Sequence, residues 1–258
     1  MSLCDTEGMP EKKGLKHKLH ERLVRDGLVD SRESAERAIL AGLVRVNGER
    51  VDKSGTLVSD SAAVTLEGKR EYVGRGALKL EAAFRFFPIS CGGLVCADVG
   101  ACTGGFTEIL LRQGASKVYA IDVGYGDLDW RIRSDARVVV MERTNARHLE
   151  SLPEPVGFVT IDVSFISLDK ILPKVSQWLT PGGVVIALVK PQFEAQREEI
   201  GDGGIVRDPL VHARVVETAR TSLQQYGLCF RGVEESPILG GEGNKEFLLW
   251  ACKESPTA

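Results

Sequence analysis

Two residues in the second half of the chain have the types and positions needed for proton transfer. Asp162 follows the apolar run 158–161, and Lys190 follows the apolar run 184–189. Short apolar runs of this kind are typical of buried strands. In a parallel sheet the carboxyl ends of the strands meet at one edge, so we expect the two side chains to lie close together. A lysine at a buried strand end, close to another cation, can lose its proton readily enough to act as a base.

A glycine-rich turn lies between a predicted strand at 94–98 and a predicted helix at 106–112. Its residues are Gly100, Ala101, Cys102, Thr103, Gly104 and Gly105. A strand, a glycine-rich turn and a helix N-terminus together form a site for a nucleotide-like ligand. The glycine spacing here is G-x-x-x-G-G, whereas dinucleotide-binding turns have G-x-G-x-x-G.

Two acids flank this turn in the sequence. Asp98 precedes it and can accept hydrogen bonds from a ligand ammonium group, while Asp122 ends the next apolar run, 117–121, and can accept from both ribose hydroxyls. This pattern favours S-adenosylmethionine, whose sulfonium and amino groups are cationic, because an acid at position 98 would repel a dinucleotide pyrophosphate. A nicotinamide dinucleotide and a purely structural loop are the alternatives.

The residues after the strand at 158–161 indicate which atom receives a methyl group. Enzymes that methylate exocyclic amines usually carry an Asn/Asp-Pro-Pro-aromatic run there, but this chain has Asp162-Val163-Ser164-Phe165 and contains no Pro-Cys pair for attack on a cytosine carbon. A ribose 2′-hydroxyl is a weak nucleophile and needs a nearby base. We therefore expect Lys190 to act as the base, oriented by Asp162.

The elements that position these residues alternate between strands and helices. The remaining strands are expected at 138–140, 229–233 and 247–251, which predicts an α/β fold with an open, doubly wound parallel sheet. A helix at 76–87 has an apolar face, and Lys79 lies off that face. On the residues alone, Lys79 is most simply a solvated helical lysine.

A smaller α+β module precedes this domain. Helices are expected at 18–26 and 32–42, followed by a hairpin at Asn47-Gly48 and short strands at 57–58 and 63–66. Residues 67–75 are polar and contain glycine. We therefore expect domains at 15–66 and 76–253, joined by a linker at 67–75.

Composition sets limits on the class of protein. The chain of 258 residues is 43% hydrophobic and 27% charged, as in soluble globular proteins. It has no run near the roughly 20 apolar residues of a membrane span and no apolar leader. Six cysteines are scattered without a CxxC pair, so we expect reduced, mostly buried thiols, no metal site and a cytoplasmic location. Residues 12–70 carry 13 Lys and Arg against 9 Asp and Glu, which hints at nucleic-acid binding.

Residues 27–58, GLVDSRESAERAILAGLVRVNGERVDKSGTLV, resemble the S4 RNA-binding domain, and the resemblance covers most of 18–66. It implies binding to structured RNA through the second helix and the hairpin, where cations can pair with phosphates. The candidate RNA-binding residues are Lys16, Lys18, Arg22, Arg32, Arg37, Arg45 and Arg50. The alternative is that these are ordinary solvated basic residues.

The run from Asp98 to Asp135, together with MERTNAR at 141–147 and IDVSFISL at 161–168, closely resembles the TlyA-type family over about residues 15–252. These are FtsJ-like ribosomal RNA 2′-O-methyltransferases, often named hemolysins. The resemblance implies a class I (Rossmann-like) methyltransferase fold, S-adenosylmethionine as the cofactor and the ribose of a cytidine in ribosomal RNA as the acceptor. Ribosomal subunits are then the expected partners, with no need for a membrane.

The resemblance also implies roles for individual residues. Gly100 to Phe106 would bind the methionine part of the donor, Asp122 the ribose, and Glu142, Arg143, Thr144 and Asn145 would lie near the adenine. FtsJ-like enzymes use a Lys-Asp-Lys-Glu tetrad, which falls here on Lys79, Asp162, Lys190 and Glu246. Lys79 would tune the charge and position the substrate, and Glu246 would hold a lysine or the ribose.

Other functions remain open at this point. A membrane-active hemolysin would need a spanning or long amphipathic segment, which the sequence lacks. A non-catalytic RNA-binding or ribosome assembly factor would not need the intact tetrad. An enzyme acting on small molecules would leave the N-terminal module without a purpose. The polar loop 194–208 is expected either to be a lid that orders on substrate or to be disordered.

Overall fold

The computed structural model describes residues 16–29, 31–66 and 72–254. The chain divides into two compact units, residues 1–71 and 72–258. Tyr72 and Val73 belong to the second unit because both side chains are buried in its core. The linker expected at 67–75 therefore ends earlier than predicted, before Tyr72, and residues 67–71 lie outside the described residues.

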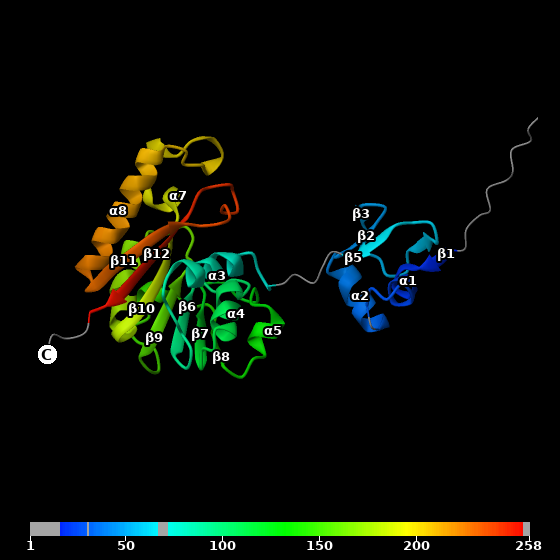
Figure 1. The fold of residues 1–258 in the computed structure, drawn as a ribbon, viewed down its shortest axis with the longest axis horizontal. Coiled ribbons are helices and arrows are strands. Elements are labelled where there is room, and N and C mark those ends of the chain that lie inside the picture. Colours follow the sequence, from blue (N-terminus) through cyan, green and yellow to red (C-terminus); the bar gives the residue numbers. More distant parts are fainter. Residues whose placement is uncertain (1–15, 30, 67–71, 255–258) are drawn as a thin grey trace, which may run out of the picture. The chain divides into compact units, whose positions relative to one another are not determined.

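The first unit is a small α+β module (Figure 1). Its elements are β1 (Lys16–Lys18), α1 (Leu19–Arg25), α2 (Arg32–Leu40), β2 (Val44–Val46), β3 (Glu49–Arg50), β4 (Leu57–Ser59) and β5 (Val64–Leu66). The side chain of Ser31 caps α2 by accepting a hydrogen bond from the Ser34 amide. Apolar residues from both helices and from β2 and β4 form the core.

The Asn-Gly turn correctly predicted the hairpin of this module. The sequence did not predict β1. Asn47 and Gly48 have φ values of 52° and 85°, as the Asn-Gly turn requires. β1 pairs with β4, and β2 lies between β3 and β5 in a separate sheet. The sequence missed β1 because three residues, Lys16-His17-Lys18, have no apolar side chain to mark a strand.

The second unit is built on a sheet of seven strands within residues 72–254, in the order β11-β12-β10-β9-β6-β7-β8. Their bounds are β6 (Val95–Val99), β7 (Lys117–Ile121), β8 (Val138–Met141), β9 (Val156–Ile161), β10 (Leu179–Val189), β11 (Leu228–Glu235) and β12 (Phe247–Lys253). β12 pairs antiparallel with both β10 and β11, and the other pairings are parallel. The predicted doubly wound sheet is confirmed and is mostly parallel. β12 runs antiparallel because a loop rather than a crossover helix joins it to β11.

Helices cover both faces of this sheet (Figure 1). They are α3 (Gly76–Phe86), α4 (Gly105–Arg112), α5 (Trp130–Arg133), α6 (Leu172–Trp178), α7 (Pro191–Glu194) and α8 (Pro209–Gln225), with short 3-10 turns at η1 (Ala146–His148), η2 (Leu168–Lys170), η3 (Arg197–Glu199) and η4 (Asp202–Gly204). Side chains of α3, α4 and α5 share one apolar core with one face of the sheet. Side chains of α6 and α8 share the second core with the other face.

The doubly wound arrangement brings four strand ends to one edge. β6, β7, β9 and β10 are parallel, and they end at Val99, Ile121, Ile161 and Val189. The chain order switches direction between β6 and β9, where ligands bind in folds of this type. The fold therefore places Asp122, Asp162 and Lys190 at a common edge of the sheet.

Candidate active site

The glycine turn after β6 is held open by backbone conformations that favour glycine. Gly100 and Gly104 have φ values of 88° and 93°, and Cys102, between them, has 47°. A Cβ on Gly100 would lie 2.4 Å from the carbonyl oxygen of Asp162. The loop after β9 can approach the turn this closely only because residue 100 has no side chain.

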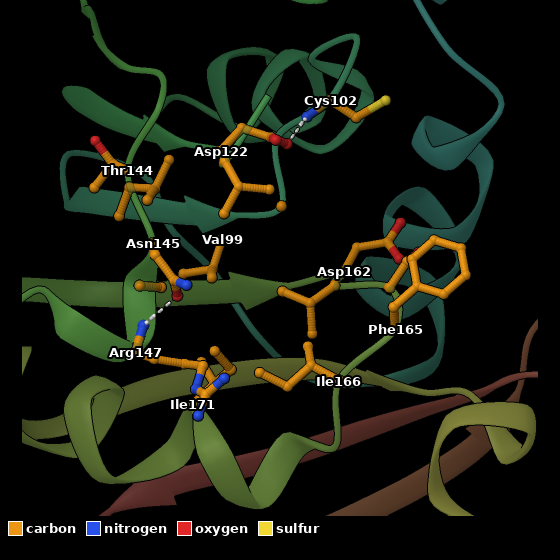
Figure 2. A pocket seen from close by; sticks show the side chains of 16 residues that line it. Val99, Cys102, Asp122, Thr144, Asn145, Arg147, Asp162, Phe165, Ile166 and Ile171 are labelled. Carbon is orange, nitrogen blue, oxygen red and sulfur yellow. Dashed lines mark hydrogen bonds between the residues drawn. The ribbon is translucent and has the colours of Figure 1, made fainter. Parts of the chain in front are cut away.

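Asp122 fixes the other side of this turn. Its carboxylate accepts a hydrogen bond of 2.7 Å from the amide of Cys102 and another of 2.7 Å from the amide of Gly124. Figure 2 shows the first of these bonds at the upper rim of the pocket. The acid after the second strand thus anchors two loops by their backbones and still faces the pocket.

A cavity of about 450 Å³ opens beside these groups (Figure 2). Its apolar wall comes from the ends of β6 and β7 and from Ile166 and Ile171, and its polar groups include Asp122, Thr144 and Asn145. A volume of this size suits a nucleoside-sized ligand. The mixture of apolar wall and a few polar groups is typical of a small-molecule site.

Only some of the predicted cofactor residues line the cavity. Gly100, Cys102, Asp122, Thr144 and Asn145 line the cavity. The remaining turn residues and the residues at 142 and 143 do not line it, and they are Ala101, Thr103, Gly104, Gly105, Phe106, Glu142 and Arg143.

Glu142 and Arg143 instead support the loop after β7. Glu142 accepts a hydrogen bond from the Gly126 amide and pairs with Arg133. The guanidinium of Arg143 lies 4.1 Å from the centre of the Tyr125 ring. Both contacts hold the loop that follows Asp122.

Asp98 requires a correction. It was expected to accept from a ligand ammonium, but it is fully buried and does not line the cavity. Thr107 and Thr160 donate hydrogen bonds of 2.7 and 2.9 Å to its two oxygens. Burial raises the pKa of Asp98 to about 6, because the charged carboxylate has left water. Asp98 therefore ties α4 to β9 beneath the turn.

Asp162 and Lys190 meet at the carboxyl ends of β9 and β10. The Nζ atom of Lys190 lies 2.6 Å from Oδ1 of Asp162. Lys190 is 8% exposed, whereas Asp162 lines the cavity. The expectation that the two strand ends bring these groups together is confirmed.

Lys79 and Glu246 form a second ion pair, which is more deeply buried. Their Nζ and Oε2 atoms are 2.5 Å apart, and their side chains are 11% and 3% exposed. Gly240 packs on this pair, because a Cβ there would lie 2.5 Å from Oε1 of Glu246. Lys79 is therefore not a solvated helical lysine.

The first turn of α3, which carries Lys79, lies close to Asp162. A Cβ on Gly76 would lie 3.8 Å from Oδ2 of Asp162. Lys79 is three residues further along α3, on the same side of the helix. The four predicted tetrad residues thus form two ion pairs, and they come from α3, the ends of β9 and β10, and the loop before β12.

Sequence reasoning gave no role to two residues that line the cavity beside Asp162. Ser164 accepts a hydrogen bond from Lys190, and Phe165 is 88% exposed with a φ of 62°. A bulky residue in this conformation is uncommon. Both belong to the run IDVSFISL, but only the contacts reveal what they do.

The loop at 194–208 folds into short helical turns rather than lying disordered. Asn244, which is fully buried, holds it by accepting from the Val206 amide and donating to the Gly204 carbonyl. Glu194 accepts from Ser167 and from the Leu168 amide. Whether this loop acts as a lid stays a prediction.

The predicted RNA-binding residues of the first unit fall into two groups. Arg22 is buried, and its guanidinium donates to Asp26 and to the Ser59 and Asp60 carbonyls, so it holds the module together. The other six are at least partly exposed, and they are Lys16, Lys18, Arg32, Arg37, Arg45 and Arg50.

The cysteines differ in part from expectation. Cys91 and Cys96 are buried, Cys229 and Cys252 are partly exposed, and Cys102 is exposed in the turn. All five are free thiols, and Cys4 lies outside the described residues. Partial burial raises the pKa of Cys102, so its thiol stays protonated near neutral pH.

The sheet order, the open glycine turn and the acids at the strand ends define an α/β enzyme of the Rossmann-like class. The model of the FtsJ-like methyltransferase family matches residues 72–253, and the model of the S4 domain matches residues 18–64. The chain belongs to the FtsJ-like methyltransferase family and carries an S4 domain before the methyltransferase domain.

Individual relatives agree with this assignment. The chain is 48% identical over 241 residues to YqxC of Bacillus subtilis, which is provisionally named an rRNA methyltransferase, covering 91% of this chain and 85% of that protein. It is 45% identical over 240 residues to the 16S/23S rRNA (cytidine-2′-O)-methyltransferase TlyA of Mycobacterium tuberculosis, covering 92% and 90%. A solved structure of a provisionally named hemolysin from Streptococcus thermophilus matches with a TM-score of 0.71 and 46% identity, covering 93% and 90%.

Proposed function

We propose that this protein transfers a methyl group from S-adenosylmethionine to the 2′-hydroxyl of a cytidine in ribosomal RNA. The observation that carries the proposal is the Lys190–Asp162 pair of 2.6 Å beside the cavity. A lysine and a carboxylate at this place suit deprotonation of a hydroxyl. The names of relatives with 45% identity over most of the chain support the ribosomal substrate.

The size and polar groups of the cavity support its assignment as the site of the methyl donor. Asp122 lies where a ribose would bind, and Asn145 and Thr144 lie further along the wall, where an adenine would bind. The donor, when bound, supplies an electrophilic methyl group on a sulfonium. No acid of the pocket has to face a phosphate, because the donor carries none.

The chain's own residues would then act on the acceptor. In its neutral form, after its ammonium has given a proton to solvent, Lys190 takes the proton of the 2′-hydroxyl and becomes an ammonium again. Asp162 holds the Lys190 amine at the strand end. Lys79 and Glu246 set the charge near the acceptor and orient its ribose. Of these four residues, only Asp162 also lines the cavity in which the donor would bind.

The first unit would dock on RNA. Its six accessible cations can pair with phosphates, and structured RNA is recognised largely through its shape and backbone. Within the described residues no helix is long and apolar enough to cross a membrane. A cytoplasmic location is part of this proposal, since ribosomal subunits are the substrate.

The proposal is tested by tritium transfer from labelled S-adenosylmethionine to large and small ribosomal subunits in separate reactions. The subunits come from a strain that lacks the modification. We expect label fixed in RNA, with one linkage made resistant to alkali, because a 2′-O-methyl group blocks cleavage there. Labelled RNA without an alkali-resistant linkage would overturn the 2′-hydroxyl as acceptor, and no label with donor binding intact would favour an assembly factor.

A further inference from the structure

The amine of Lys190 has a second oxygen neighbour that the tetrad does not include. Its Nζ atom donates to Oγ of Ser164 at 3.1 Å, in addition to the contact of 2.6 Å with Asp162. Ser164 and Asp162 both line the cavity, whereas Lys190 itself is almost fully buried. The amine therefore forms an ion pair with Asp162 and donates a hydrogen bond to Ser164, and both of these partners face the cavity.

The valence of a primary amine gives this arrangement a consequence. A neutral amine has two N–H bonds and one lone pair at staggered positions. When the deprotonated amine keeps one N–H on Ser164 and turns the other toward Asp162, its lone pair must take the third position. With Asp162 alone, rotation about the Cε–Nζ bond would leave the lone pair free to occupy either of two positions.

Two further contacts hold Ser164 against Lys190. The rings of Phe165 and Phe193 lie 5.1 Å apart, and Glu194 accepts from the Ser167 hydroxyl at 2.7 Å. The segment after β9 is thus joined to the segment after β10 at three successive places. These contacts hold the backbone at Ser164 close to the end of β10, where Lys190 lies.

We propose that Ser164 is a positioning residue that directs the lone pair of the Lys190 amine. The inference rests on the proposed function, in which Lys190 is the base. Asp162 alone supplies the charge, and Ser164 supplies the second point that stops rotation of the amine. Ser164 adds no charge and forms no covalent bond.

The test compares Ser164→Thr with Ser164→Val, because these two side chains have nearly the same shape and differ by the hydroxyl. Ser164→Ala is the third variant, in case the valine does not fit. Single-turnover methyl transfer to ribosomal RNA is measured at saturating donor and RNA. Donor affinity by calorimetry and the thermal midpoint are measured on each protein.

We expect Ser164→Thr to react within about threefold of the natural protein. Ser164→Val and Ser164→Ala should be slower by about 10-fold, the effect of one lost hydrogen bond at a reacting group. Because Ser164 lines the cavity, the rates are compared at saturating donor, as set by the affinity measured for each variant. Equal rates for the threonine and valine variants would overturn the inference.

A parallel measurement on Lys190→Ala separates the two proposals. If Lys190→Ala is inactive while Ser164→Thr and Ser164→Val react equally, the base stands and the role of Ser164 falls. If Lys190→Ala retains turnover, the assignment of the base falls, and the role of Ser164 falls with it. Both proposals are supported if the Ser164→Thr and Ser164→Val substitutions change the rate differently when Lys190 is present and equally when it is replaced by alanine.

Discussion

The donor cavity and the lysine–carboxylate cluster lie side by side but are built differently. The cavity is shaped by backbone: left-handed glycines in one turn and two amides that bind Asp122. The cluster is made of side chains from positions 79, 162, 190 and 246, paired across elements far apart in the chain. Because the two regions are built differently, donor binding and methyl transfer should respond separately to substitution.

The largest expected effect comes from breaking the buried pair of the cluster. Lys79→Met leaves Glu246 charged, buried and without its cation, so we expect about 3–5 kcal/mol lower stability and a loss of turnover of at least about 100-fold. Denaturant unfolding and single-turnover rates measure the two effects.

A double variant separates charge balance from chemistry. Lys79→Met with Glu246→Leu removes both charges, so stability should largely return while turnover stays lost. Full activity in the double variant would mean that this pair only supports the fold.

The cavity should respond in affinity instead. Asp122→Ala removes the acceptor of two backbone amides and of the ribose, so donor affinity should fall about 10- to 100-fold by calorimetry. The single-turnover rate at saturating donor should change less than about threefold. Asp135→Asn is the matched control, since that acid pairs with Arg137 away from the cavity. A large rate loss at saturating donor would show that Asp122 also acts in the chemical step, and would contradict the separation of donor binding from chemistry.

Asp98, which is buried beneath the glycine turn, should make the stability depend on pH. Its pKa is about 6 in the folded protein against 3.8 ordinarily, so the folded state holds the proton more tightly. This contribution to stability is complete below about pH 4 and is lost as the pH rises through about 6. Asp98→Asn should therefore gain on the natural protein between pH 4.5 and 7.5, by at most about 3 kcal/mol in denaturant unfolding. A constant difference across this range would contradict the assigned burial effect.

The smallest effect is expected in the S4 unit, outside both regions. Arg32→Glu with Arg37→Glu should weaken RNA binding and lower the salt slope by about 2, because two exposed cations leave. Arg22→Gln should instead lower the thermal stability of this unit, since its guanidinium binds Asp26 and two carbonyls. An unchanged salt slope for the Arg32 and Arg37 variant would remove this helix from the RNA contact.

The two regions also differ in how far the sequence could predict them. The glycine turn and Asp122 are contiguous signals, because a turn between a strand and a helix needs glycine locally. The Lys190–Asp162 pair was predictable because each residue directly follows an apolar run typical of a strand. Lys79 gave no local signal, because its burial depends on Glu246, which is 167 residues away.

The errors have the same origin. Asp98 and Arg22 have residue types that suit ligands. Only tertiary contacts reveal that Thr107 and Thr160 already satisfy Asp98, and that the Ser59 and Asp60 carbonyls bind Arg22. The reversed direction of β12 depends on a connection that the apolar pattern does not encode. Ser164 and Phe165 were missed because their roles come from the neighbouring strand end.

The most direct test of the account measures donor affinity and single-turnover methyl transfer on Lys190→Ala beside Asp122→Ala. The account predicts that Lys190→Ala binds the donor within about twofold of the natural protein and transfers methyl groups about 10²- to 10⁴-fold more slowly. Asp122→Ala should show the opposite pattern, with weak binding and a nearly normal rate at saturation. Turnover above a few per cent in Lys190→Ala would contradict the central claim that the lysine at the end of β10 is the base.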